Sequence, residues 1–241
     1  MQGEFALNTL VLDTSTQIEH VAARSGCVVS DITRRMDRSH SATLFINIDS
    51  ALRGAGLSPR ELELVGVGIG PGSFTGIRIA VSTARALAQV LGVPLVGVHS
   101  PLLFASSVKA SAGTHILVAF DAKKGRVFGA LYQRQGDGQD RAIVTPGDYE
   151  MQLLARAIPA GSAVMAAGDG AFRYRDELDH GECRISFLED FAPEGASSCA
   201  LAERTYQSDP SRWNDLTAIV PDYARKSDAE VVRDLKRQSG P

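Results

Sequence analysis

A glycine-rich stretch at residues 68–80, GIGPGSFTGIRIA, has two features of a phosphate-binding loop: clustered glycines and an apolar, helix-compatible segment directly after them. The spacing fits neither common nucleotide motif. No lysine follows the glycines as in a Walker A loop, and Ser73 stands where the dinucleotide motif has glycine. A tight turn before a helix remains, and free N–H groups of a first helical turn can attract an anion. Two interpretations stay open: Gly72 and Ser73 hold an anion, or Ser73 or Thr75 only caps the helix.

The end of the first predicted strand, TLVLDTS at residues 9–15, offers a second place for phosphate chemistry. Asp13 and the hydroxyl residues after it stand where ATPases of the actin and sugar-kinase type have their first phosphate loop. Asp13 can position a metal-bound water there, and Thr14 and Ser15 can contact phosphate. Because Ser15 replaces the usual glycine, a strand-end turn with self-bonded hydroxyls also explains the segment. An ATPase or small-molecule kinase using Asp13 and the glycine loops therefore stays open as an alternative function.

The sequence contains no residue pattern for a metal centre or a hydrolytic nucleophile. No two of its histidines stand three or four residues apart, as a metal-binding pair on one helix face would: His20, His40, His99, His115 and His180. The three cysteines are widely spaced and form no CxxC motif, which predicts a reduced, cytoplasmic protein. A GxSxG nucleophile motif is also absent. We therefore expect no metal site and no intrinsic cofactor.

A cationic turn lies in FDAKKGRVFGALY at residues 120–132, where Asp121 precedes Lys123, Lys124 and Arg126. Such a turn can contact phosphate or RNA, or it can simply be solvated, and both possibilities stay open. The net charge of the 241-residue chain is -3, which argues against a protein that binds nucleic acid on its own. The sequence also predicts neither a secretory signal nor a membrane span.

The periodicity of apolar residues predicts an α/β protein. Residues 9–35 read as a three-stranded antiparallel meander, followed by helix, strand, helix and strand at 41–53, 64–70, 74–91 and 94–100. This β-β-β-α-β-α-β order is that of a ribonuclease-H-like core. A small, polar stretch at 106–113 separates a first lobe, residues 1–106, from a smaller second lobe, residues 107–241, with a frayed end. In the second lobe we expect a strand, turn and strand at 115–133, a helix at 148–158, a strand at 163–170 and a helix at 197–206.

The helix predicted at 74–91 has two apolar sides. One side carries Ile77, Ala80 and Ala84, whereas another carries Ile79 and Val90. A surface helix normally has a single apolar stripe, so two stripes predict contact with the sheet and with a second body. That second body is either another element of this chain or a partner protein.

Together these segments resemble the TsaB (YeaZ) family over residues 9–228. The resemblance is carried by LDTST, HSATLFINIDSAL, GIGPGSFTGIRIAVSTARALA, PLVGVHS, FDAKKGRVFGALY, GDG and PDYARKSDAE. It implies two ribonuclease-H-like lobes of the actin, Hsp70 and sugar-kinase (ASKHA) type. It also implies a non-catalytic relative of TsaD, the subunit that transfers threonylcarbamoyl to adenine in tRNA. Its implied partners are TsaD, the ATPase TsaE and a second copy of the chain. The resemblance also implies that the chain contacts tRNA only as part of the complex, and that ATP binds it only weakly or within the complex.

The resemblance further implies a partner surface on the helices at 41–53 and 74–91. Its expected residues are Leu44, Phe45, Ile48, Phe74, Ile77, Arg78, Ala80, Val81, Ala84 and Arg85. TsaD binds its metal through a helical histidine pair, whereas the matching helix here holds His40 alone, so no catalytic residue is expected. Two departures from the family pattern lie in that helix: Phe45 replaces a leucine, and Ile46 and Asn47 replace a proline. Residues 171–194 match no motif of the family.

Overall fold

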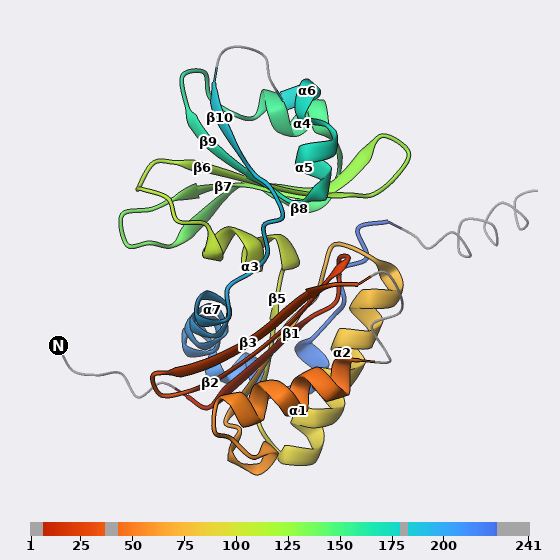
Figure 1. Ribbon diagram of the computed structural model, residues 1–241, viewed down its shortest axis with the longest axis vertical. Coiled ribbons are helices and arrows are strands. Elements are labelled where there is room, and N and C mark those ends of the chain that lie inside the picture. The colour runs from red at the N-terminus through yellow and green to blue at the C-terminus, as the bar shows by residue number, and fades with distance from the viewer. Residues whose placement is uncertain (1–6, 37–42, 179–182, 226–241) are drawn as a thin grey trace, which may run out of the picture.

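The structure is a computed structural model that describes residues 7–36, 43–178 and 183–225. The chain forms two stacked lobes, each built on a five-stranded mixed sheet (Figure 1). The first sheet has the strand order β3-β2-β1-β4-β5. Its strands are β1 (Thr9–Asp13), β2 (Ile18–Ser25), β3 (Val28–Arg35), β4 (Leu64–Gly68) and β5 (Leu95–Val98).

The second sheet repeats the connectivity of the first, with the order β8-β7-β6-β9-β10. In each lobe the first three strands form an antiparallel meander, and the fourth strand pairs in parallel with both the first and the fifth. The strands are β6 (His115–Asp121), β7 (Arg126–Arg134), β8 (Asp140–Glu150), β9 (Ala163–Ala167) and β10 (Arg184–Leu188). The repeated topology confirms the prediction of two ribonuclease-H-like α/β lobes.

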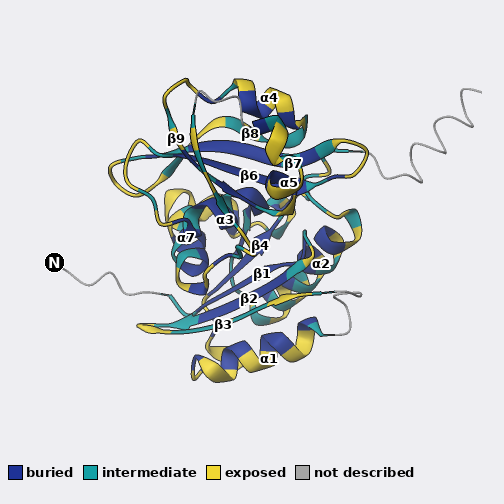
Figure 2. Cartoon of the chain, turned by 45° about the horizontal axis from the view of Figure 1, so that its top comes forward, coloured by how far each residue is buried: buried dark blue, intermediate teal, exposed yellow. Residues whose placement is uncertain are grey.

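Helices cover both faces of the first sheet. α1 (Leu44–Gly54) and α2 (Phe74–Leu91) lie on the face that points away from the second lobe, while α3 (Ser100–Ser107) and α7 (Gly195–Ser208) lie between the sheets (Figures 1 and 2). The shorter helices are α4 (Met151–Arg156), α5 (Asp169–Arg173), α6 (Arg175–Leu178) and α8 (Pro210–Trp213), with 3₁₀ turns at Pro59–Glu61 and Leu216–Ala218. A search of the described residues finds no helix with the length and apolar character of a membrane span.

Local sequence signals set the ends of α2 where they were predicted. The Ser73 hydroxyl accepts a hydrogen bond from the Gly76 N–H at 3.3 Å, which satisfies one free donor of the first turn. Gly92 ends the helix in the left-handed conformation, at a φ of 69°. The capping box of Ser58 and Glu61 is also present, but it caps only a single 3₁₀ turn.

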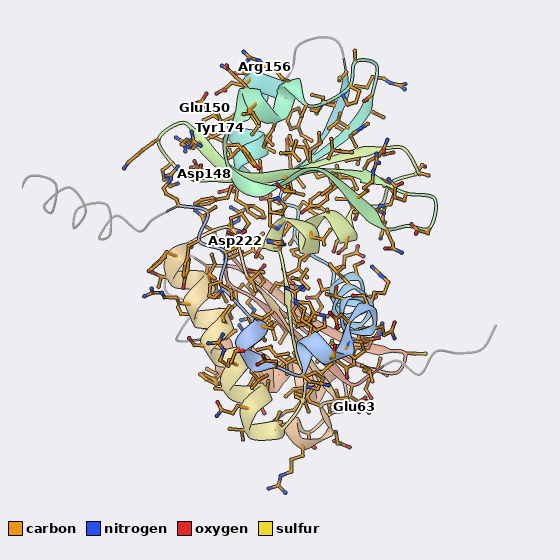
Figure 3. All side chains as sticks on the ribbon, turned by 180° about the vertical axis from the view of Figure 1, so that it is seen from behind. Glu63, Asp148, Glu150, Arg156, Tyr174 and Asp222 are labelled. Atoms are coloured by element: carbon orange, nitrogen blue, oxygen red, sulfur yellow. The ribbon has the colours of Figure 1, made fainter. Side chains whose placement is uncertain are left out.

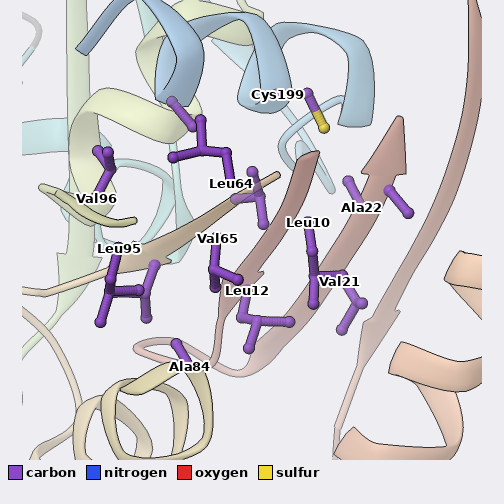
Figure 4. Close-up of a cluster of buried hydrophobic side chains, with 14 of the residues drawn as sticks. Leu10, Leu12, Val21, Ala22, Leu64, Val65, Ala84, Leu95, Val96 and Cys199 are labelled. Atoms are coloured by element: carbon purple, nitrogen blue, oxygen red, sulfur yellow. The ribbon is translucent and has the colours of Figure 1, made fainter. Parts of the chain in front are cut away.

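The core of the first lobe is a sheet enclosed between helices. Figure 4 shows Leu10 and Leu12 of β1 in this layer, with Cys199 of α7 on one side and Ala84 of α2 on the other. β1 is therefore buried along its whole length. Gly66 in β4 permits the close approach of α7, since a Cβ at this position would lie 2.9 Å from the Cβ of Ala202.

Several elements after residue 99 differ from the predictions. α7, α8 and the residues after them pack on the first lobe, with Cys199, Trp213 and Ile219 in its core. The predicted division had assigned all of 107–241 to the second lobe. The chain returns because the first sheet needs a helix on the face that α1 and α2 leave open. In addition, α3 and β8 were not predicted, and the helix expected at 148–158 forms only over Met151–Arg156.

Candidate functional site

The side of α2 that carries Ile77, Ala80 and Ala84 packs on the first sheet. All three residues are completely buried within this chain. Six of the ten residues expected at a partner surface are core residues of this kind: Leu44, Ile48, Ile77, Ala80, Val81 and Ala84. This corrects the prediction, because a side chain enclosed between its own helix and sheet cannot contact a partner of the folded chain.

The opposite side of the same two helices carries exposed apolar residues among polar ones such as Asp49 and Ser82. Phe45 and Ile46 on α1 are 63 % and 65 % exposed, and Val90 on α2 is 84 % exposed. Ala86 of α2 is exposed on this side as well, and Ile79 is half-buried there and packs against the core of its own lobe. We call these five residues the outer face of α1 and α2. Soluble proteins normally bury large apolar side chains, so several of them on one layer of helices mark a candidate interaction surface.

A buried carboxylate sets the rotation of α1 and therefore decides which residues form the outer face. Glu19 of β2 accepts hydrogen bonds from the Asn47 side-chain amide and, at 3.2 Å, from the Thr43 hydroxyl. Asn47 is consequently turned toward the sheet, and Phe45 and Ile46 are left facing solvent. The predicted start of this helix at residue 41 lies outside the described residues.

Three other residues of the expected partner surface bind the C-terminal segment of their own chain. Phe74 packs against Tyr223 with 4.6 Å between ring centroids and 40° between ring planes, and Arg78 donates to the Tyr223 hydroxyl at 3.1 Å. Arg85 donates to the Ile219 carbonyl at 2.6 Å. These side chains hold residues 219–225, which we call the strap, against α2.

The strap also joins the two lobes. Its Asp222 N–H donates to the Ile69 carbonyl at 2.8 Å, directly after β4. Arg225 then donates to both oxygens of the Asp148 carboxylate in β8, at 2.8 and 3.1 Å, and to the Ala122 carbonyl at 3.1 Å. Figure 3 shows Asp148 on the second lobe and Asp222 on the strap below it. Groups of both lobes thus hold one short segment.

The glycine loop covers the polar end of β1. Asp13, Thr14 and Ser15 are at most 2 % exposed. The Ser73 N–H donates to the Ser15 carbonyl at 2.6 Å, and the Thr14 hydroxyl donates to the Gly76 carbonyl at 2.7 Å. This arrangement favours the capping-turn interpretation over an anion site for both segments, because the groups that would contact a phosphate face one another.

The Asp13 carboxylate is held mainly by its own turn. One oxygen accepts from the Ser15 N–H at 2.6 Å, while the other oxygen and the Ser15 hydroxyl have no hydrogen-bond partner among the described residues. Gly68 leaves room for this carboxylate, since a Cβ there would lie 2.3 Å from Oδ2. Asp13 is thus placed as a buried group rather than as a group open to a ligand.

A buried serine and histidine and an exposed aspartate come together between β2, β3 and α7. The Ser198 hydroxyl lies 2.9 Å from His20 Nε2, and His20 Nδ1 lies 2.8 Å from the Thr33 hydroxyl and 3.6 Å from Asp31. These residue types resemble a hydrolase triad. Ser198 is completely buried, however, so the network ties α7 to the sheet and offers no nucleophile to a substrate.

Burial decides the charge of this histidine. Desolvation lowers the pKa of His20, although the nearby Asp31 and Asp13 carboxylates act in the opposite direction. His20 is therefore neutral at pH 7, and one ring nitrogen must accept a hydrogen bond. Sequence reasoning had no signal for this network, because His20 and Ser198 are 178 residues apart.

The cationic turn between β6 and β7 has carboxylate partners in its own lobe. Lys123 Nζ lies 2.8 Å from Asp121, and Arg126 donates to Asp148 at 2.8 Å. Burial alone would raise the pKa of Asp121, but hydrogen bonds from Lys123 and the charges of Lys123 and Arg173 outweigh it and lower this pKa. Contact of Lys123, Lys124 or Arg126 with RNA stays a prediction.

The described residues contain no cluster of three metal-ligating side chains. His40, which the sequence comparison with TsaD singled out, lies outside the described residues.

Comparison with known proteins identifies the family. Residues 11–188 match the family model of TsaD, described as tRNA N6-adenosine threonylcarbamoyltransferase. The TsaB protein of Escherichia coli is 28 % identical over 78 % of this chain and 85 % of its own length. TsaB of Bacillus subtilis is 25 % identical over 93 % of this chain and 97 % of its own length.

The chain belongs to the TsaD family, as a TsaB (YeaZ) member.

Solved structures agree with this placement in fold. A Pseudomonas aeruginosa protein described as similar to the peptidase YeaZ superposes with a TM-score of 0.78, covering 90 % of this chain and 99 % of its own, at 24 % identity. YeaZ of P. aeruginosa superposes with a TM-score of 0.72 at 23 % identity, covering 84 % of this chain and 93 % of its own. The two-lobed architecture is therefore that of known YeaZ structures.

Within this TsaB member, the PDYAR motif near the C-terminus forms most of the strap. The motif supported the family resemblance, but nothing in its residue types indicates that Tyr223 contacts α2 or that Arg225 reaches the second lobe. The apolar pattern of α2 similarly indicated two faces without deciding which one meets the sheet. Contacts between distant parts of the TsaB chain were needed for both assignments.

Proposed function

We propose that this TsaB-family chain is a non-catalytic accessory subunit in the synthesis of threonylcarbamoyladenosine in tRNA. Its relatives in E. coli and B. subtilis are named tRNA threonylcarbamoyladenosine biosynthesis proteins. The proposed partner is a TsaD-like catalytic subunit, and a TsaE-like ATPase joins the pair. The chain contacts tRNA only as part of this complex. The proposed place of action is the cytoplasm.

The outer face of α1 and α2 carries this proposal. Phe45, Ile46 and Val90 present apolar surface that the described part of the chain leaves exposed. Burying such a surface against another helical lobe removes it from water, and helix pairs from two lobes pack well as a four-helix contact. A TsaD-like subunit is the proposed source of these helices, because this chain itself matches the TsaD family model.

The closed end of β1 supports the accessory role. An ATPase that used Asp13 would need this carboxylate open to a metal-bound water and to phosphate. Asp13 is instead buried, and the glycine loop is hydrogen-bonded across the residues that follow it. We therefore place the chemistry of the complex in the partner subunit.

Co-elution of the purified chain with the TsaD-type subunit of the same genome in size-exclusion chromatography tests the proposal. The unmodified chain should form a heterodimer. Val90→Arg and Phe45→Arg should abolish it while leaving the chain folded, since an unpaired charge inside an apolar interface costs about 2–5 kcal/mol. Leu153→Arg, at an exposed apolar position on α4 of the second lobe, is the matched control and should still pair.

Two results would contradict the proposal. One is the absence of association between two folded, unmodified proteins. The other is ATP hydrolysis by the isolated chain that Asp13→Asn removes, which would support the kinase or ATPase alternative. A separate measurement tests whether a homodimer uses the same face. Sedimentation of the unmodified chain at several concentrations detects the homodimer, and Val90→Arg should dissociate it if the outer face forms the contact.

A further inference from the structure

A cavity of about 240 Å³ opens between the two lobes. The first lobe contributes the start of β2, the end of β3 and one residue of α3, while the second lobe contributes the ends of β6, β9 and β10 and part of α5. The residues that decide its chemistry are Phe104, Phe120, Phe172, Phe191, Asp169 and Glu189. Clefts between lobes are common positions for small-molecule sites, and this volume suits a ligand of only a few heavy atoms.

Aromatic rings form the wall of this cavity. Phe104 of α3 packs against Phe120 with 4.7 Å between ring centroids and an angle of 66° between ring planes. It also lies 6.4 Å from Phe191, at 55°. The rings are thus tilted against one another rather than stacked. Phe172 of α5 adds a fourth ring from the second lobe; it is 41 % exposed, and the Arg175 guanidinium lies 5.0 Å from its centroid.

The charged groups around the rings are mostly carboxylates. Asp169, Glu189 and Asp190 line the cavity, whereas Arg35 is its single lining cation among the described residues. Arg35 is already paired with Asp190 at 3.2 Å. Asp169 is held in place because one of its oxygens accepts the Asp121 N–H at 3.1 Å. Such a lining repels phosphate and attracts positive charge.

We propose that this cavity binds a small organic cation, such as a quaternary ammonium or guanidinium group. Ring faces attract a cation through their quadrupole, and the carboxylates at the rim add direct charge attraction. A nucleoside triphosphate fits neither the volume nor the charge of the lining. This site is separate from the outer face of α1 and α2, so the proposal does not depend on the accessory role of the chain.

Titration of the purified chain, followed in amide NMR spectra, tests the proposal with four probes. Choline carries a quaternary ammonium group, agmatine a guanidinium group, and dimethylbutanol is the uncharged isostere of choline. Mg-ATP is the anionic probe. We expect one or both cations to shift the amide signals of Gly168, Asp169 and Phe172, and to bind at least about tenfold more tightly than dimethylbutanol.

Variants separate the two contributions to binding. Phe172→Leu keeps an apolar side chain but removes a ring, and it should weaken binding of the cation about threefold to tenfold. Glu189→Gln removes one charge from an exposed position and should weaken binding and its dependence on salt. Glu150→Gln removes an exposed carboxylate outside the cavity and should leave the affinity unchanged.

Three results would overturn the proposal. Equal affinity for choline and dimethylbutanol means that the rings only bury apolar surface. Tighter binding of Mg-ATP, with shifts at the same amides, means that the cleft is a nucleotide site. No shift by either cation, in a chain whose spectrum shows it folded, means that the cavity holds no cation.

Discussion

Asp148 in β8 receives the Arg225 guanidinium through both carboxylate oxygens, and it also accepts from Arg126. One carboxylate thus joins the end of the strap to the second lobe. Its side chain is largely buried, so water screens the pairs only weakly.

Removing either partner of the Arg225–Asp148 pair should loosen the contact between the lobes. We expect Arg225→Ala to lower the free energy of unfolding by about 1.5–3 kcal/mol, the usual contribution of a hydrogen bond to a charged group. Asp148→Ala should cost more, because it also leaves Arg126 without this partner. Urea denaturation measures both effects. Glu150→Ala, which removes an exposed carboxylate 3.7 Å from Arg126, should change the stability little.

The two sides of α2 should respond in opposite ways to the same substitution. Ala84→Arg places a charge between α2 and the sheet, where no partner is available, and should prevent folding. Val90→Arg places the charge in solvent and should leave the melting temperature nearly unchanged. Circular dichroism during heating compares the two variants. Equal stability of both would mean that the sheet packs against the other side of the helix.

A Cβ at Gly76 should destabilise the fold although alanine is the better helix former. The Cβ would lie 1.9 Å from the Thr14 carbonyl oxygen, so the glycine loop would have to move away from the end of β1. We expect Gly76→Ala to lower the free energy of unfolding by about 1–3 kcal/mol or more, which exceeds the helix-propensity gain of about 1 kcal/mol. Gly136→Ala is the control, since a Cβ there meets no atom within 4 Å and the residue has no positive φ. Chemical denaturation should show little change for the control.

The buried His20 should make the fold less stable in acid. Its pKa is lowered in the folded chain, so below its ordinary value of 6.5 the unfolded chain binds the proton more readily. The contribution of His20 is therefore fully present above about pH 6.5. It should be lost as the pH falls from there toward the folded pKa, by at most about 1.4 kcal/mol per pH unit.

A comparison of the chain with a His20→Gln variant isolates this effect. Denaturation at several pH values should give a stability difference that shrinks as the pH falls below 6.5. The comparison is necessary because burial also lowers the pKa of His115, which contributes with the same sign in both proteins. A difference that is constant with pH would mean that His20 has the same pKa in the folded and unfolded states.

The sequence by itself determined the features that short segments specify. Ser73 and Gly92 end α2 because a hydroxyl and a left-handed glycine satisfy the helix termini wherever the helix lies. A short apolar run that ends in polar turn residues similarly predicted β1, and the turn residues Ser25 and Gly26 separated β2 from β3. The family motifs then indicated the TsaB (YeaZ) family and its two lobes before any tertiary contact was considered.

Only the tertiary structure decided which surfaces meet. Both sides of α2 are apolar, and periodicity cannot tell whether Ala84 or Val90 faces the sheet, because each choice satisfies the same helical pattern. α7 packs on the first lobe although it comes after the second lobe along the chain. Arg225 likewise contacts Asp148, which lies 77 residues earlier in the sequence. Such contacts depend on the packing of the whole chain, in which each helix takes the sheet face that the others leave open.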